Sequence, residues 1–217
     1  MYNLFKLCLE ADYIHTEAGT DYAVQVEGDT IYILFEWSDG KEDWRSNFNF
    51  PCRAYKNGGK TWFAHRGFIK AWKDVRDEIE MQVSEILAVY GSQIGKICVV
   101  GYSHGAALAL LCTEDMAYLY GDALVVGGYG FGCPRVVWGF LPKAVKTRLK
   151  AFKVIRNVPD LVTHVPPVLF GFRHPCRVIK IGRRRGIFKL IPKYTPIKAH
   201  YPGNYSRELA ESEVHSE

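Results

Sequence analysis

A Gly-x-Ser-x-Gly turn between two apolar segments constrains the fold of this chain more than any other feature. The turn, residues 101–105, follows the β-type run 97–100 and precedes an Ala- and Leu-rich segment. Glycine on both sides of the serine removes the Cβ atoms that would clash at a tight strand-to-helix bend. The helix dipole and a backbone N–H beside the serine can then stabilise negative charge. Ser103 is therefore a candidate nucleophile, and the alternative is a serine that only caps a core helix.

The length of the chain fits one domain. Its 217 residues contain no repeat and no linker-like stretch, so we expect a single domain over residues 1–217. The first 13 residues have no basic lead, and Glu10 and Asp12 interrupt their apolar stretch, which makes a poor secretory signal. We expect a cytoplasmic protein, or a secreted one whose leader is absent from this numbering.

The six cysteines are scattered along the chain. They form no Cys-x-x-Cys pair and no His/Cys group with the spacing of a zinc site. We expect no structural disulfide, although Cys8 or Cys52 could pair, and no metal.

Positive charge is concentrated in the last third of the chain. Residues 135–207 contain 17 Lys and Arg and one acid, Asp160, in a chain with a net charge of +5. Such a distribution attracts anionic surfaces, although a merely solvated basic face would look the same. Three arginines, residues 183–185, predict a charged hairpin tip between 178–181 and 187–190. Because no motif that reads nucleic acid accompanies them, we expect no nucleic-acid partner.

Strand and helix patterns alternate along the chain. The first pair of β-type runs, 22–26 and 30–36, predicts a hairpin. The polar stretch 37–61 is rich in turn residues and predicts a long loop, which in a compact domain is usually functional. Amphipathic or apolar helices are expected at 68–90, 104–119 and 140–149, and further strands at 96–100, 124–131, 152–155 and 177–181. This order predicts an α/β fold with a mainly parallel sheet, whose ligands lie at the carboxyl ends of the strands.

A serine nucleophile needs a base and an acid, and in this fold the acid follows the serine. Glu114 and Asp115 lie about three turns along the helix that follows Ser103, and we expect them to face solvent. Asp122 lies in the next turn. Asp160 directly follows a strand, among apolar residues and prolines, where an unpaired carboxylate is costly. Asp160 is the favoured acid, and the alternative is a salt bridge to an arginine.

The base must come later in the chain than the acid. His200 lies in a late loop that opens a short helix, which suits a side chain brought back to the sheet edge. His164 is the main competitor, but it is four residues from the acid and fits the same loop, and His174 begins a strand. The side chain of His104 cannot readily reach back to Ser103, so its backbone N–H is the more useful group.

Across residues 22–205 the chain resembles the class 3 (fungal-type) lipases, which have the α/β-hydrolase fold. Six segments in the same order carry the resemblance: Phe35-Glu36-Trp37-Ser38 with Asp43-Trp44, His65-Arg66-Gly67-Phe68, the serine turn, residues 130–136, residues 157–162 with Pro166-Pro167, and His200 with Tyr205.

The resemblance implies a Ser103, Asp160, His200 triad that hydrolyses carboxylic esters through an acyl-enzyme intermediate, without a cofactor. It also implies an oxyanion hole formed by the backbone N–H of His104 and by Ser38. Two positions depart from the family pattern. Glu36-Trp37 replaces the usual Arg-Gly before Ser38, and His104 stands where leucine is common.

The segment after the oxyanion residue corresponds to the family's lid. About residues 39–51, this segment mixes charged residues with Trp44, Phe48 and Phe50. A lid helix with the aromatics turned inward would shield the site in water and move at a lipid surface, whereas the alternative is a fixed surface loop.

The resemblance implies a lipase acting on acylglycerols, with an ester or lipid substrate and transient contact with a lipid–water interface. An esterase and a phospholipase A1-type enzyme are close alternatives. A third alternative is a non-catalytic lipid-binding protein of the same fold. The sequence gives no indication of the oligomeric state.

Overall fold

The computed structural model describes residues 1–37, 51–182 and 198–214, with side chains described up to residue 212. Ser38, the lid candidates Trp44, Phe48 and Phe50, and the predicted arginine tip at 183–185 lie outside the described residues.

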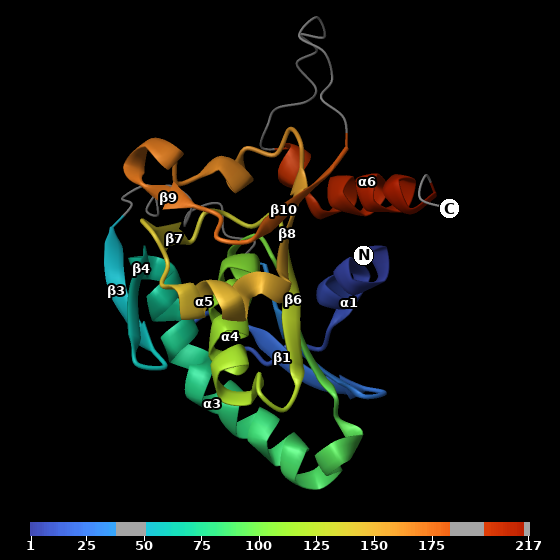
Figure 1. The fold of residues 1–217 in the computed structure, drawn as a ribbon. Coiled ribbons are helices and arrows are strands. Elements are labelled where there is room, and N and C mark those ends of the chain that lie inside the picture. The colour runs from blue at the N-terminus through green and yellow to red at the C-terminus, as the bar shows by residue number, and fades with distance from the viewer. Residues whose placement is uncertain (38–50, 183–197, 215–217) are drawn as a thin grey trace, which may run out of the picture.

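A six-stranded sheet forms the centre of the molecule (Figure 1). Its strand order is β1-β2-β5-β6-β8-β10, and all neighbours are parallel except the β1–β2 hairpin. The strands are β1 (Tyr22–Glu27), β2 (Thr30–Phe35), β5 (Lys96–Tyr102), β6 (Val125–Phe131), β8 (Phe152–Asn157) and β10 (Arg177–Ile181). The predicted hairpin and mainly parallel sheet are confirmed.

Helices cover both faces of this sheet (Figure 1). On one face lie α3 (Arg66–Tyr90), α4 (His104–Tyr120) and the short α5 (Lys143–Arg148), followed by η2 (Leu149–Ala151). On the other face lie α1 (Tyr2–Glu10) and α6 (Pro202–Val214), which contact each other. None of the described helices combines the length and the apolar character that a membrane span requires.

Alternate residues of β5 supply the two halves of the core. Ile97 and Val99 belong to the cluster under α3 and α4, whereas Val100 and Tyr102 belong to the cluster under α1 and α6. This period of two is the geometry of a strand buried on both faces, and it explains the continuous apolar run in the sequence. Helix α1 was not predicted, and its Phe5 is fully buried against the second cluster.

A second, antiparallel sheet corrects the prediction of a loop over residues 52–61, the part of the stretch 37–61 that forms strands in the described residues. Its order is β3-β4-β7-β9, formed by β3 (Cys52–Asn57), β4 (Lys60–His65), β7 (Val137–Trp138) and β9 (Phe172–Arg173). Gly58 and Gly59 have positive φ angles and make a two-residue hairpin turn. The polar composition of these strands hid the hairpin, because most of their side chains are exposed while Tyr55 and Trp62 are buried.

The expected exposure of Glu114 and Asp115 is wrong, because both carboxylates are buried on α4. Asp115 Oδ2 accepts hydrogen bonds from the Tyr55 hydroxyl at 2.5 Å and from Trp72 Nε1 at 2.6 Å. Glu114 pairs with Arg148 of α5. The two acids thus join β3, α3, α4 and α5 through hydrogen bonds and an ion pair.

All six cysteines lie in the described part of the chain and are free thiols.

Candidate active site

The serine turn connects β5 to α4 and holds Ser103 in an unusual backbone conformation. Ser103 has φ 56° and ψ −118°, and it is the one non-glycine residue with positive φ among those described. Strain of this kind costs about 1–3 kcal/mol and persists where the surrounding structure enforces it.

The glycines on either side of Ser103 are required by space. A Cβ on Gly101 would lie 2.2 Å from the carbonyl oxygen of Gly105. A Cβ on Gly105 would lie 2.5 Å from the carbonyl oxygens of Phe35 and Glu36. The turn therefore packs directly against the end of β2, and the sequence motif follows from this close contact of backbones.

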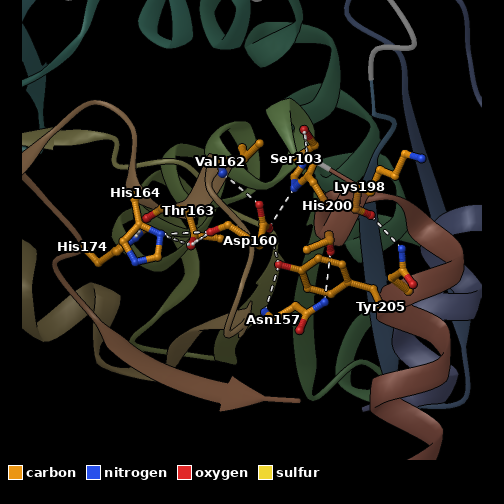
Figure 2. Close-up of polar contacts among 12 residues, drawn as sticks. Ser103, Asn157, Asp160, Val162, Thr163, His164, His174, Lys198, His200 and Tyr205 are labelled. Carbon is orange, nitrogen blue, oxygen red and sulfur yellow. Dashed lines mark hydrogen bonds and ion pairs between the residues drawn. The ribbon is translucent and has the colours of Figure 1, made fainter. Parts of the chain in front are cut away.

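Ser103, His200 and Asp160 form one hydrogen-bonded line (Figure 2). Ser103 Oγ lies 2.8 Å from His200 Nε2, and His200 Nδ1 lies 2.8 Å from Asp160 Oδ2. The serine is 1 % exposed, the histidine 8 % and the aspartate 0 %. The structure thus brings together three residues that lie far apart in the sequence, at the carboxyl ends of parallel strands.

Asp160 is held by two further donors. The backbone N–H of Val162 donates to its Oδ1 at 2.8 Å, and the hydroxyl of Tyr205 donates to its Oδ2 at 2.6 Å. Tyr205 itself accepts a hydrogen bond from the backbone N–H of Asn157 at 3.1 Å (Figure 2). Burial, together with the nearby Asp160 carboxylate, raises the pKa of Tyr205 well above its usual value, so the hydroxyl stays a donor.

His200 ends η5 (Lys198–His200) and lies in a closely fitting slot. The ring of Tyr102 stacks on the imidazole, with centroids 5.1 Å apart and an angle of 22° between the planes. Gly132 has φ +60°, and a Cβ there would lie 2.7 Å from His200 Cε1. The slot therefore fixes the plane of the imidazole as well as its distance from Ser103.

The competing histidines have other partners. His164, at the end of η3 (Val162–His164), bonds through Nδ1 to the carbonyl oxygen of Asp160 at 2.9 Å. Nε2 of His174 lies 3.0 Å from the carbonyl oxygen of Thr163, and burial lowers the pKa of His174 to about 4. Both residues therefore shape the loop that carries the acid and do not contact Ser103.

Arg135 is a site residue whose role the sequence does not reveal. Its side chain is buried, and its Nη1 donates to the carbonyl oxygens of His164 and of Pro166, the latter at 2.9 Å. It thereby fixes the loop after Asp160 from the neighbouring strand end. Both Arg135 and Tyr205, the second residue that holds the Asp160 loop, fall in segments that carry the family resemblance, and this was the one indication of their importance in the sequence.

The candidate oxyanion residues are only partly described. His104 is the first residue of α4, directly after Ser103, where a backbone N–H points out of the helix N-terminus. Its ring packs against Phe68, with centroids 5.5 Å apart. Trp37 packs on Tyr102 at 5.7 Å, and a cavity of about 40 Å³ lies beside it, lined in part by His104 and Leu108.

One group of side chains could hold a metal ion. Among the described residues, His15, Asp21 and Glu36 bring three possible ligand atoms within 4.8 Å of one another. His15 is largely exposed and pairs with Asp21 at 2.7 Å. None of the three belongs to the line formed by Ser103, His200 and Asp160.

The fold and the site together define an α/β-hydrolase: a mainly parallel sheet, a serine on a strained strand-to-helix turn, and an acid and a histidine that follow in that order.

The comparisons with known sequences agree with this class. The family described as lipase (class 3) matches residues 32–170, so the chain belongs to the class 3 lipases. A secreted mono- and diacylglycerol lipase 1 from Fusarium solani is 33% identical over 147 residues, which are 66% of this chain and 41% of the relative. A lipase from Rhizomucor miehei is 33% identical over 151 residues, which are 67% of this chain and 40% of that protein. The chain thus spans about two fifths of the length of these relatives.

Solved structures give the same result. Lipase II from Rhizopus niveus has a TM-score of 0.67 and 26% identity, covering 78% of this chain and 64% of that one. A triacylglycerol lipase whose catalytic centre is described as a serine protease triad has a TM-score of 0.66 and 28% identity, covering 79% and 66%.

Proposed function

We propose that the protein is a serine carboxylester hydrolase that acts on acylglycerols. The observation that supports this most strongly is the line of two 2.8 Å contacts from Ser103 Oγ through His200 to Asp160. Because the chain covers less than half of its first two relatives, their substrates support the proposal by likeness only.

The proposed reaction begins with attack of Ser103 Oγ on the ester carbonyl carbon, while His200 Nε2 takes the hydroxyl proton. The tetrahedral intermediate collapses as His200 returns that proton to the leaving alcohol, which leaves an acyl-enzyme. Water then repeats the sequence, and the carboxylic acid departs. Asp160 fixes the tautomer of His200 and stabilises its charged form.

The backbone N–H of His104 and the N–H and hydroxyl of Ser38 are the proposed donors to the oxyanion. Each such donor contributes about 3–4 kcal/mol to transition-state stabilisation in related systems. The segment 39–51, with Trp44, Phe48 and Phe50, remains the proposed lid. We also propose that residues 1–217 form one domain, since α3 and α4 pack against strands of both sheets.

A phospholipase A1-type activity is the second candidate. A chloroplastic phospholipase A(1) from Arabidopsis thaliana is 25% identical over 179 residues, 79% of this chain. The basic last third of the chain would favour an anionic phospholipid over a neutral glyceride. The relatives from Fusarium solani and Malassezia globosa are named as secreted, which supports a secreted protein and not a cytoplasmic one.

Hydrolysis of a series of p-nitrophenyl esters, from acetate to palmitate, tests the proposal. We expect Ser103→Ala to lose at least about a thousandfold in kcat, because it removes the attacking oxygen. Ser84→Ala, an exposed serine on α3, is the matched control and should hydrolyse esters as the wild type does. Equal rates for wild type and Ser103→Ala would refute the proposed nucleophile.

A further inference from the structure

The second sheet and the turn beside it expose large apolar side chains. Leu169 is 92 % exposed and Phe140 is 80 % exposed, although both are large aliphatic or aromatic groups. The full set, here called the apolar face, consists of Phe63 of β4, Trp138 of β7, Phe140, and Val168, Leu169 and Phe170 of η4 (Val168–Phe170). Contiguous apolar surface of this kind marks an interaction site more often than scattered single residues do.

The elements that carry the apolar face are joined to one another. Phe63 packs edge-on against Trp138 with ring centroids 5.7 Å apart, and Trp138 Nε1 donates to the carbonyl oxygen of Phe170 at 2.9 Å. The backbone N–H of Gly139 donates to the carbonyl oxygen of Gly171 at 3.0 Å. These contacts hold η4 to β7, so its apolar side chains project from a fixed base.

Positive charge predominates in the segments that build the apolar face. Residues 51–66 contain four Lys and Arg and residues 134–182 contain ten. Two of these are engaged elsewhere, since Arg135 binds carbonyl oxygens and Arg148 pairs with Glu114. The one acid in the two segments is Asp160, which is fully buried and bound to His200. The guanidinium of Arg173 lies 4.4 Å from the centre of the Phe140 ring, so a cation lies directly on this face. The charge therefore complements an anionic partner.

The apolar face is also connected to the proposed active site. The loop that begins at Asp160 ends in η4, and Arg135 fixes its middle. On the other side, ring contacts run from Phe172 of β9 through His65 and Phe68 to His104, which adjoins Ser103. Figure 1 shows β9 at the end of the molecule where the parallel strands have their carboxyl ends.

We propose that the apolar face docks the protein on the surface of anionic lipid. Leu169 and Phe140 enter the boundary between headgroups and acyl chains, and the surrounding cations bind the headgroups. The apolar face is formed in the described structure by residues 63, 138, 140 and 168–170, none of which belongs to the segment 39–51. This inference rests on the proposed function, because it assigns the kind of surface on which the ester substrate is met.

The charge pattern gives the proposal a specific signature. Each cation near an anionic membrane strengthens binding about fivefold, and salt screens this contribution. A face that acted through apolar contact alone would bind zwitterionic and anionic surfaces equally. Binding should therefore rise with the anionic lipid fraction and fall as salt is added.

Co-sedimentation with vesicles tests the proposal without using the chemistry. Vesicles of phosphatidylcholine, with and without phosphatidylglycerol, are mixed with wild type, Leu169→Asp, Phe140→Ser and Val89→Asp. Val89 is 76 % exposed on α3, remote in sequence from the apolar face, and serves as the matched control. We expect Leu169→Asp and Phe140→Ser to bind the anionic vesicles at least about tenfold more weakly, and Val89→Asp to bind as the wild type does.

Hydrolysis of a soluble short-chain ester without vesicles separates the two proposals. All these variants should retain wild-type hydrolysis. If none hydrolyses the ester while the binding pattern holds, the proposed function fails and the docking surface stands. Binding that is equal on both vesicle types, or equal for Leu169→Asp and Val89→Asp, would overturn the docking proposal. A dimer that Leu169→Asp dissociates, with unchanged vesicle binding, would overturn it in favour of contact between two copies.

Discussion

At the scale of single residues, the position of His200 depends on the absence of a side chain at Gly132. Its φ of +60° strains any L-residue, and a Cβ would lie 2.7 Å from the imidazole. Gly28 has the same φ of +60° with nothing within 4 Å of an added Cβ. The two glycines therefore separate the cost of backbone strain from the cost of displacing the histidine.

We expect Gly28→Ala to lose about 1 kcal/mol of stability, from backbone strain alone, and to keep full esterase activity. Gly132→Ala should lose more stability and at least about tenfold in kcat, because the imidazole must move away from Ser103. Urea denaturation and ester hydrolysis measure the two effects. Equal activity of the two variants would contradict the slot around His200.

The three residues of the hydrogen-bonded line follow from sequence rules, since Ser103 lies in its motif and Asp160 is a lone acid after a strand. The residues that hold them do not. Tyr205 donates to Asp160 from a helix 45 positions away, and the stacking of Tyr102 on His200 spans 98 positions. Such contacts depend on how elements pack, which no local pattern encodes.

At the scale of elements, the junction of β3, α3 and α4 depends on a buried acid. The pKa of Asp115 is raised from a usual value of 3.8 to about 7, chiefly because the carboxyl is buried. The hydrogen bonds from Tyr55 and Trp72 oppose this rise, and the nearby Glu114 adds to it. The folded protein therefore binds a proton that the unfolded chain has lost between these two pH values. Stability from this group falls as pH rises from about 4 to about 7.

We expect Asp115→Asn to remove this dependence, because the amide does not ionise. The shift corresponds to roughly 4 kcal/mol at most, lost by the wild type and kept by the variant as pH rises. Urea denaturation at pH 5 and pH 8 should show the variant gaining stability relative to the wild type at the higher pH. A constant difference between the two proteins would contradict the raised pKa.

The alternation of strands and helices was predictable because long apolar or amphipathic runs fix the elements of a buried parallel sheet. The β3–β4 hairpin was not, since most of its side chains are exposed and its buried ones, Tyr55, Trp62, Ala64 and His65, form no regular apolar run. The burial of Asp115 was missed because its partners Tyr55 and Trp72 lie on other elements.

At the scale of the whole molecule, the serine turn, the loop that begins at Asp160 and the apolar face lie at one end of the central sheet. Helices α1 and α6 cover one face of the central sheet, and α3 and α4 cover the other. Ser103, Asp160 and His200 lie near the carboxyl ends of its strands. A substrate held at a surface would thus meet Ser103 from the same side as the apolar face.

The central claim is that His200 and Asp160 activate Ser103 as a nucleophile, and covalent labelling tests it most directly. A fluorophosphonate is added to the folded protein, and the modified residue is located by mass spectrometry. We expect one label per chain, on Ser103, with none on Ser103→Ala and labelling at least about a hundredfold slower on His200→Ala. A wild-type protein that stays unlabelled, or one labelled at another residue, would contradict the claim.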